Sequence, residues 1–153
     1  MDEARWQELF RPYSVFGGEL LVTKLGEPPG VCAIYPKGIG PAMVTPDVMK
    51  MTPNLAVAHP KFLMHYFNSQ TARDFATGVA FGTTRSRLTL PIFREMPVPL
   101  PSLAEQTRIV AEVERRLSVV EELEVVVSAN LQRATRLRQS ILQKAFTGEL
   151  CSS

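Results

Sequence analysis

The sequence predicts an α+β protein in which a small domain of short strands and one helix leads into a long C-terminal helix. All 12 prolines lie at or before Pro101, and eight of the nine glycines lie at or before Gly82. Neither residue occurs between Ser102 and Thr147. Because proline and glycine interrupt helices, we divide the chain into a mixed domain over residues 1–101, a helix over 102–148 and a tail over 149–153.

Short apolar runs separated by turn residues fill the first segment. Extended structure is expected at 19–25 and 31–35 around a turn at 26–30, and at 42–45 and 48–51 around Pro46. One strong helical pattern runs from Pro60 to Phe75, and Gly78–Gly82 is expected to end it. Short extended pieces are expected at 88–90 and 96–100. Strands that precede a helix and then return favour an α+β fold over repeating βαβ units.

A long helix is predicted to begin directly after the proline-rich stretch. Prolines at 97, 99 and 101 hold the chain extended up to Ser102, which fits the N-cap position with Glu105 three residues further on. Gly148 fits the position just past the C-terminus of the helix. A continuous helix over residues 103–147 would be roughly 65–70 Å long.

Apolar residues recur along this helix at steps of three and four, and they form a stripe that a solitary helix would leave in water. Because the chain offers no second helix of comparable length, we expect an antiparallel partner helix in another molecule, such as a second copy of the chain. A helix packed on its own domain is the alternative. The residues expected at the pairing surface are Val113, Leu117, Val120, Val127, Leu131 and Ile141.

Charges modify this picture in two ways. Glu124 and Arg138 occupy the strict seven-residue register that Val110, Leu117 and Leu131 set, so the heptad is not a clean one. Glutamates fill the first half of the helix, whereas Arg and Lys fill the second half. This distribution suits the helix dipole and an antiparallel partner, although a solvated face of mixed charge explains part of it.

Composition indicates a cytoplasmic protein. The formal net charge is only +2, from 17 basic and 15 acidic residues, which is far from a strongly basic nucleic-acid-binding surface. Cys32 and Cys151 stand far apart and fit a reducing compartment. The acidic start of the chain does not resemble a signal peptide, and no apolar run approaches membrane-spanning length.

The best candidate for a binding site outside the long helix is the stretch from Gly82 to Leu88. Arginine can hold phosphate or the edge of a guanine in two hydrogen bonds, and hydroxyl groups can add phosphate contacts. We expect no nearby carboxylate to neutralise these donors, although an ordinary solvated loop is the alternative. The DNA-contact candidates are Arg85, Arg87, Thr83, Thr84 and Ser86, with Lys24 as a second choice beside the 26–30 turn.

Enzyme and metal motifs do not emerge from the sequence. It has neither a phosphate-binding Gly-x4-Gly-Lys-Ser/Thr loop nor a Gly-x-Gly-x-x-Gly stretch. His59 and His65 have no cysteine nearby, and we interpret them as a loop residue and a helix-surface residue. We expect no catalytic residue, no metal and no cofactor.

Several segments resemble the specificity subunit of type I restriction–modification enzymes. The closest is 93–106, where a Pro-Val-Pro-Leu-Pro run leads into a Leu-Ala-Glu-Gln helix start. The end of the helix, 137–150, is also similar. Further segments that resemble the family, in its order, are 18–22, 60–63 with Tyr66, Phe67, Asn68 and Ser69, 82–85, and 88–90.

The resemblance implies a non-catalytic DNA-recognition role. Such subunits carry two target-recognition domains, each followed by a long helix. The helices pair antiparallel and set the spacing between the halves of a split target. Methyltransferase (M) subunits dock on them and supply the S-adenosylmethionine site, and a restriction (R) subunit completes the complex. The expected partners are therefore DNA, the M subunit, the R subunit and a second specificity-type helix.

The chain departs from this family in length. A full subunit is more than twice as long, so the sequence corresponds to part of one recognition domain plus its helix. A fragment, a truncated product and a half-subunit that works as a pair all remain open. The alternative functions are an assembly module without DNA contact and a small enzyme with an irregular site.

Overall fold

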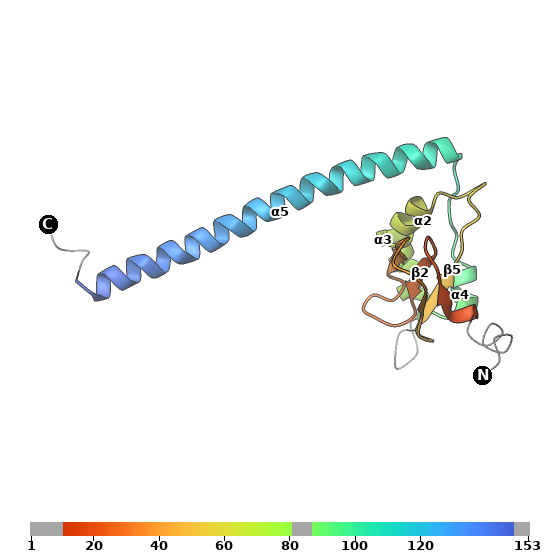
Figure 1. Cartoon of the computed structure of the whole chain (residues 1–153), viewed down its shortest axis with the longest axis horizontal. Helices are drawn as coiled ribbons and strands as arrows, with labels where there is room; N and C mark the ends of the chain where they lie inside the picture. Colours follow the sequence, from red (N-terminus) through yellow and green to blue (C-terminus); the bar gives the residue numbers. More distant parts are fainter. Residues whose placement is uncertain (1–10, 81–86, 149–153) are drawn as a thin grey trace. The chain divides into compact units, whose positions relative to one another are not determined.

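A computed structural model describes residues 11–80 and 87–148 of the chain. The described elements divide into two compact units, Met1–Val110 and Ala111–Ser153, each of which is treated by itself below. The division falls inside the long helix, whose first two turns belong to the first unit. The α+β class predicted from the sequence is confirmed: short strands and helices precede one very long helix (Figure 1).

The first unit contains a three-stranded antiparallel sheet in the order β3-β2-β5 and a two-stranded pair, β1-β4. In chain order its elements are η1 (Arg11–Tyr13), β1 (Ser14–Val15), β2 (Leu20–Thr23), β3 (Cys32–Ile34), β4 (Ala42–Met43), β5 (Val48–Met51), α2 (Pro60–Phe67), α3 (Gln70–Ala80), α4 (Leu90–Arg94) and the start of α5 (Leu103–Phe146). The predicted extended segments are thus confirmed, with the predicted bounds at 48–51 and with shorter bounds at 19–25, 31–35 and 42–45.

The central strand β2 organises the core. Leu20 and Val22 are completely buried, while the residues between and after them are partly exposed, as expected for a strand with one face on the core. Leu21 pairs with Ala33 of β3 on one side and with Lys50 of β5 on the other. The turn from β2 to β3 ends at Gly30, whose φ of +90° lies in the region that favours glycine.

Helices α2 and α3 supply much of the rest of the core. Phe62, Leu63 and Phe67 of α2 are buried, and the Phe67 ring lies 5.0 Å from the ring of Phe93 in α4. The predicted single helix from Pro60 to Phe75 is wrong, because it is broken at 68–69 and α3 then continues past Gly78 to Ala80.

The break has a physical cause in the side chain of Asn68. Its Nδ2 donates to the Cys32 carbonyl at 2.7 Å, and its Oδ1 accepts from the Cys32 backbone N–H at 3.0 Å. These Cys32 groups belong to the outer edge of β3, since its neighbours bond to β2. Asn68 therefore acts as a substitute for the peptide group of one more strand, and α2 ends where this contact is made.

A second difference concerns residues 88–100. Of the extended piece expected at 88–90, Thr89 is extended and forms the N-cap of helix α4, which begins at Leu90 and has Pro91 in its first turn. Leu88 is fully buried, so its apolar character reflects packing and not strand pairing. Residues 97–100 carry no regular secondary structure, and the Tyr66 hydroxyl donates to the Pro97 carbonyl.

The long helix follows the prediction closely. The backbone N–H of Glu105 donates to Ser102 Oγ at 3.3 Å, and Gly148 has a φ of +79° just past the helix. The 44 residues of α5 correspond to about 66 Å of helix. Within the described residues, no helix combines the length and apolar character needed to span a membrane.

Candidate nucleic-acid interface and the long helix

The predicted loop lies only partly within the described residues. Thr83, Thr84, Arg85 and Ser86 fall in the segment 81–86, which lies outside them. Arg87 and Leu88 are described. The backbone N–H of Leu88 donates to the carbonyl of Lys24 at 2.9 Å, and its buried side chain packs against Gly30. The end of the predicted loop is therefore held against the end of β2 and the 26–30 turn.

Arg87 has an acidic neighbour that the sequence did not reveal. Its Nη2 lies 3.2 Å from Asp47 Oδ1, and both side chains are about half exposed, at 51% and 52%. The expectation that no carboxylate lies near the loop is wrong for Arg87. Asp47 is 40 positions away in sequence and reaches Arg87 because the turn before β5 lies beside the end of β2.

Lys24 lies at the centre of the same edge. Its backbone N–H donates to the Asp47 carbonyl at 2.8 Å, and its Nζ donates to the Pro46 carbonyl at 2.6 Å. The structure thus brings Lys24 and Arg87, two of the predicted DNA-contact residues, to one edge of the domain together with Asp47. We call Lys24, Asp47 and Arg87 the basic edge.

The basic edge can bind an anion or a polar base edge. Among the residues that the structure describes, Arg87 contacts Asp47 through Nη2, and its guanidinium carries further N–H groups that could bind a ligand. The adjacent carboxylate reduces the attraction of Arg87 for phosphate and can hold its side chain in one orientation. A neutral acceptor pair such as the guanine O6 and N7 atoms suits such an arginine.

No metal-ligand cluster accompanies this edge: among described residues, no group of three His, Cys, Asp or Glu side chains could hold an ion. His59 lies at the N-cap position of α2, where its backbone N–H donates to Gln106 Oε1. His65 was predicted as a helix-surface residue. It does lie on α2, but its side chain is only partly exposed and its Nε2 atom is buried. Cys32 is buried in β3, and this burial raises the pKa of its thiol to about 12.

Gln106 joins the start of α5 to the first unit, and sequence reasoning did not single it out for this role. It is completely buried, and its Nε2 donates to the carbonyls of Val57 at 2.9 Å and Pro101 at 2.8 Å. Its Oε1 accepts from the His59 N–H at 2.8 Å. Both amide donors and the carbonyl acceptor are thus used, four residues before the buried Val110. Its position could have indicated this role, because an uncharged polar residue on the apolar face of the first turn of a helix is expected to be buried and hydrogen-bonded.

The second unit exposes its side chains to solvent. Every residue of the helix from Arg115 onward is exposed, including five of the predicted pairing residues, while Val113 is intermediate. Among the predicted pairing residues, the exposed fraction is 64% at Val127 and 68% at Leu131. The predicted stripe is therefore present on α5 and is uncovered in this single chain.

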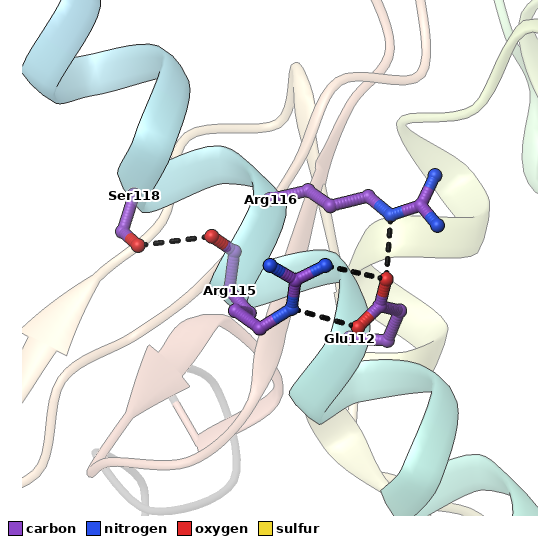
Figure 2. A network of polar contacts seen from close by, with 4 residues as sticks. All are labelled: Glu112, Arg115, Arg116 and Ser118. Atoms are coloured by element: carbon purple, nitrogen blue, oxygen red, sulfur yellow. Dashed lines mark hydrogen bonds and ion pairs between the residues drawn. The ribbon is translucent and has the colours of Figure 1, made fainter.

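The polar face of the same helix carries local ion pairs. Glu112 accepts from Arg115 and Arg116, at 2.9 and 2.7 Å, three and four residues further along (Figure 2). Hydrogen bonds from Arg115 and then Arg116 lower the pKa of Glu112 to about 2. Such pairs support an isolated helical segment, although each exposed pair contributes little to stability.

Comparison with known families identifies the chain. The model of the family described as "Type I restriction modification DNA specificity domain" matches residues 9–122. The chain belongs to this family. The match includes the whole basic edge and the first part of α5.

Individual relatives agree with this assignment. The specificity subunit of the type I restriction enzyme EcoBI from Escherichia coli is 34% identical over 103 residues, which are 67% of this chain and 22% of that protein. The EcoKI specificity subunit of Escherichia coli (strain K12) is 31% identical over 137 residues, 87% of this chain and 30% of that protein. The chain spans less than a third of the length of these relatives.

Solved structures share the fold. A chain from a study entitled "Structural basis underlying complex assembly and conformational transition of the type I R-M system" matches with a TM-score of 0.71 and 22% identity, over 88% of this chain and 32% of its own length. The HsdS subunit from Thermoanaerobacter tengcongensis matches with a TM-score of 0.61 and 24% identity, over 71% and 28%. The specificity-domain fold therefore extends over most of the chain.

Proposed function

We propose that this specificity-domain chain recognises DNA within a type I restriction–modification complex and positions the M and R subunits on a bipartite target. The observation that carries the proposal is the family match over residues 9–122, which contains both the basic edge and the start of the long helix. The chain itself is proposed to catalyse nothing, in keeping with relatives that are named specificity subunits.

Residues 1–101 are proposed to contact DNA through the basic edge and the loop before it. The proposed contacts are made by Arg85 and Arg87, with Thr83, Thr84, Ser86 and Lys24 in support. Exposure of half of the Arg87 side chain and its place beside Lys24 support this assignment. The nearby Asp47 favours base reading over simple phosphate attraction for Arg87.

Residues 102–148 are proposed to pair with another long helix and to offer a docking surface to the M subunit. The support is the uncovered apolar stripe on α5, since contiguous exposed apolar surface marks interaction sites. The alternative is an assembly module whose first unit never touches DNA. Under this alternative, the ion pair with Asp47 only neutralises Arg87 at the surface.

Salt-dependent DNA binding separates the two functions. Fluorescence anisotropy would be measured for the chain assembled with its M subunit, using target and scrambled duplexes at several salt concentrations. Target binding that weakens steeply with salt supports DNA recognition. Stable assembly with the M subunit but no preference for target DNA supports the assembly module. A folded chain that does not retain the M subunit contradicts the docking role.

The variant Arg87→Ala then tests the basic edge. If Arg87 reads a guanine, its loss is expected to cost about 1–3 kcal/mol and to relax one base position. If it holds phosphate, binding weakens for all sequences and the salt slope falls by about 0.9. Arg94→Ala, which removes an exposed arginine from α4, is the matched control. If Arg87→Ala and Arg94→Ala have the same DNA affinity, base preference and salt slope, Arg87 is not part of the DNA interface.

A further inference from the structure

The position of Asp47 is fixed by the turn that leads into β5. The backbone N–H of Val48 donates to the carbonyl of Thr45 at 3.0 Å, which closes a turn with Pro46 and Asp47 at its two central positions. Proline suits the first of these positions because its φ is already near the value that such turns need. The Asp47 carbonyl accepts from the Lys24 N–H at 2.8 Å. The half-exposed Asp47 carboxylate thus projects from a backbone that is held in place.

Arg87 is held beside Asp47 through the same residue at the end of β2. The Leu88 N–H donates to the Lys24 carbonyl at 2.9 Å, and the Leu88 side chain is completely buried. Lys24 therefore binds Asp47 through its backbone N–H and Leu88 through its backbone C=O. With both backbones tied to one residue, Arg87 Nη2 lies 3.2 Å from Asp47 Oδ1. The basic edge consequently presents hydrogen-bond donors and an acceptor next to each other.

The adjacent donors and acceptor match the major-groove edge of one kind of base pair. A G·C pair presents two acceptors, guanine N7 and O6, followed by the N4 amino donor of cytosine. The guanidinium of Arg87 can supply two N–H donors, and the carboxylate of Asp47 can accept from the amino group. An A·T pair presents an acceptor, a donor and an acceptor, so the arginine fork would place one of its donors against the adenine amino group. The two side chains together therefore suit a G·C pair.

The charge of Asp47 favours a role in discrimination over a role in overall affinity. A carboxylate at an edge that faces DNA is repelled by the phosphates and lowers the electrostatic part of the affinity. The same charge makes a wrong base costly, because Asp47 would then face an acceptor such as thymine O4. Arg87 and the ammonium of Lys24, which donates to the neighbouring Pro46 carbonyl at 2.6 Å, partly compensate the repulsion.

We propose that Asp47 reads the cytosine of one G·C base pair through its carboxylate, while Arg87 donates to the guanine of the same pair. This inference rests on the proposed DNA-recognition function and adds to it a second base-reading residue and the base pair that is read. Asp47 is then a specificity-determining residue. Loss of its side chain relaxes one position of the target and leaves or raises the affinity for other sequences, because a negative charge is removed from the basic edge.

Selection from a library of duplexes with randomised positions locates the base pair. The chain assembled with its M subunit is compared with the same assembly carrying Asp47→Ala, Arg87→Ala or Glu95→Ala. Glu95 is an exposed carboxylate at the end of α4, so its removal is matched in charge to that of Asp47. Asp47→Ala and Arg87→Ala are expected to lose preference at the same G·C position, by about tenfold for Asp47→Ala. Glu95→Ala should keep every preference.

Modified bases at that position separate a base contact from mere positioning of Arg87. N4-methylcytosine still pairs with guanine but lacks the N–H that faces the major groove, so the unmodified assembly should bind it about tenfold more weakly in fluorescence anisotropy. Asp47→Ala should bind the methylated and unmethylated duplexes within about threefold of each other. Inosine opposite cytosine keeps N7 and O6, and both assemblies should bind it as they bind guanine.

The outcomes distinguish this inference from the function on which it rests. It is overturned, with DNA recognition intact, if the selected target has no G·C position that depends on both residues. The same holds if N4-methylcytosine has no effect on the unmodified assembly, or weakens it and Asp47→Ala equally. Weaker binding of Asp47→Ala to all duplexes alike also overturns it, since Asp47 would then serve only the structure of the edge. An unmodified assembly that selects no sequence overturns both the inference and the proposed function.

Discussion

Replacement of Gln106 by leucine is expected to destabilise the first unit strongly. Leucine fills most of the same space but can neither donate to the Val57 and Pro101 carbonyls nor accept from the His59 N–H. Gln106 is completely buried, so water cannot readily replace these three bonds. A buried polar group left without a partner costs at least about 1 kcal/mol.

The three groups together give a loss of about 3 kcal/mol in the free energy of unfolding. For a domain of this size the melting temperature is expected to fall by at least about 12 °C. Gln106→Glu should be no milder near neutral pH, since a carboxylate keeps the shape but turns an acceptor toward two carbonyl oxygens.

Urea unfolding followed by near-ultraviolet circular dichroism measures this loss. Apart from the exposed Phe146, the aromatic residues of the described chain belong to the first unit, so the signal depends little on the α5 helix content. Thr107→Ala, at the exposed neighbouring position, is the control and should change stability by less than about 0.5 kcal/mol. A loss of less than about 1 kcal/mol in Gln106→Leu would refute the argument that these three bonds hold the helix start on the domain.

Three other outcomes are expected. Asn68→Ala removes both bonds to Cys32 and should lower the free energy of unfolding by about 2 kcal/mol in thermal melts, whereas an unchanged melting temperature would contradict their role. In a Cys151→Ser background, the Cys32 thiol, with its pKa raised to about 12 by burial, should react with Ellman's reagent only after denaturation; rapid reaction of the native chain would show that this burial is not maintained. The pKa of Glu112 is about 2 in the helix and about 4.5 without its arginine partners, so its contribution to helix content is complete above about pH 4.5 and is lost as the pH falls through about 2. Circular dichroism at 222 nm should therefore show less acid-induced loss of helix in Glu112→Gln than in the unmodified chain, and equal losses would contradict this contribution.

The long helix could be predicted from the sequence because its signals are local. Ser102 caps the first turn, Gly148 takes a left-handed conformation after the last one, and neither proline nor glycine interrupts the residues between them. The strands β2 and β5 were predictable for a similar reason, since a short apolar run bounded by turn residues can be recognised within a short window of sequence.

The parts that escaped prediction depend on contacts between distant residues. Helix α2 ends at Asn68 because the Asn68 side chain binds the backbone of Cys32, 36 positions earlier. The residues around Asn68 in the sequence do not indicate this contact. The same holds for Asp47 beside Arg87, which required the register of β5 on β2 to be known. Residues 88–90 were interpreted as a short extended piece because so short a Leu-Thr-Leu run does not distinguish a strand from the residues that lead into a helix.

The side chain of Asn68 also has a consequence for solubility. Outer edges of sheets expose unpaired N–H and C=O groups that can template the addition of strands from other molecules, which is a common route to aggregation. At Cys32, the first residue of β3, both of these groups are already occupied by one amide side chain. Asn68 thus prevents a strand of another molecule from pairing with β3 at this position. Loss of this side chain would leave the Cys32 N–H and C=O groups unpaired at the edge, which would favour aggregation as well as weaken the domain.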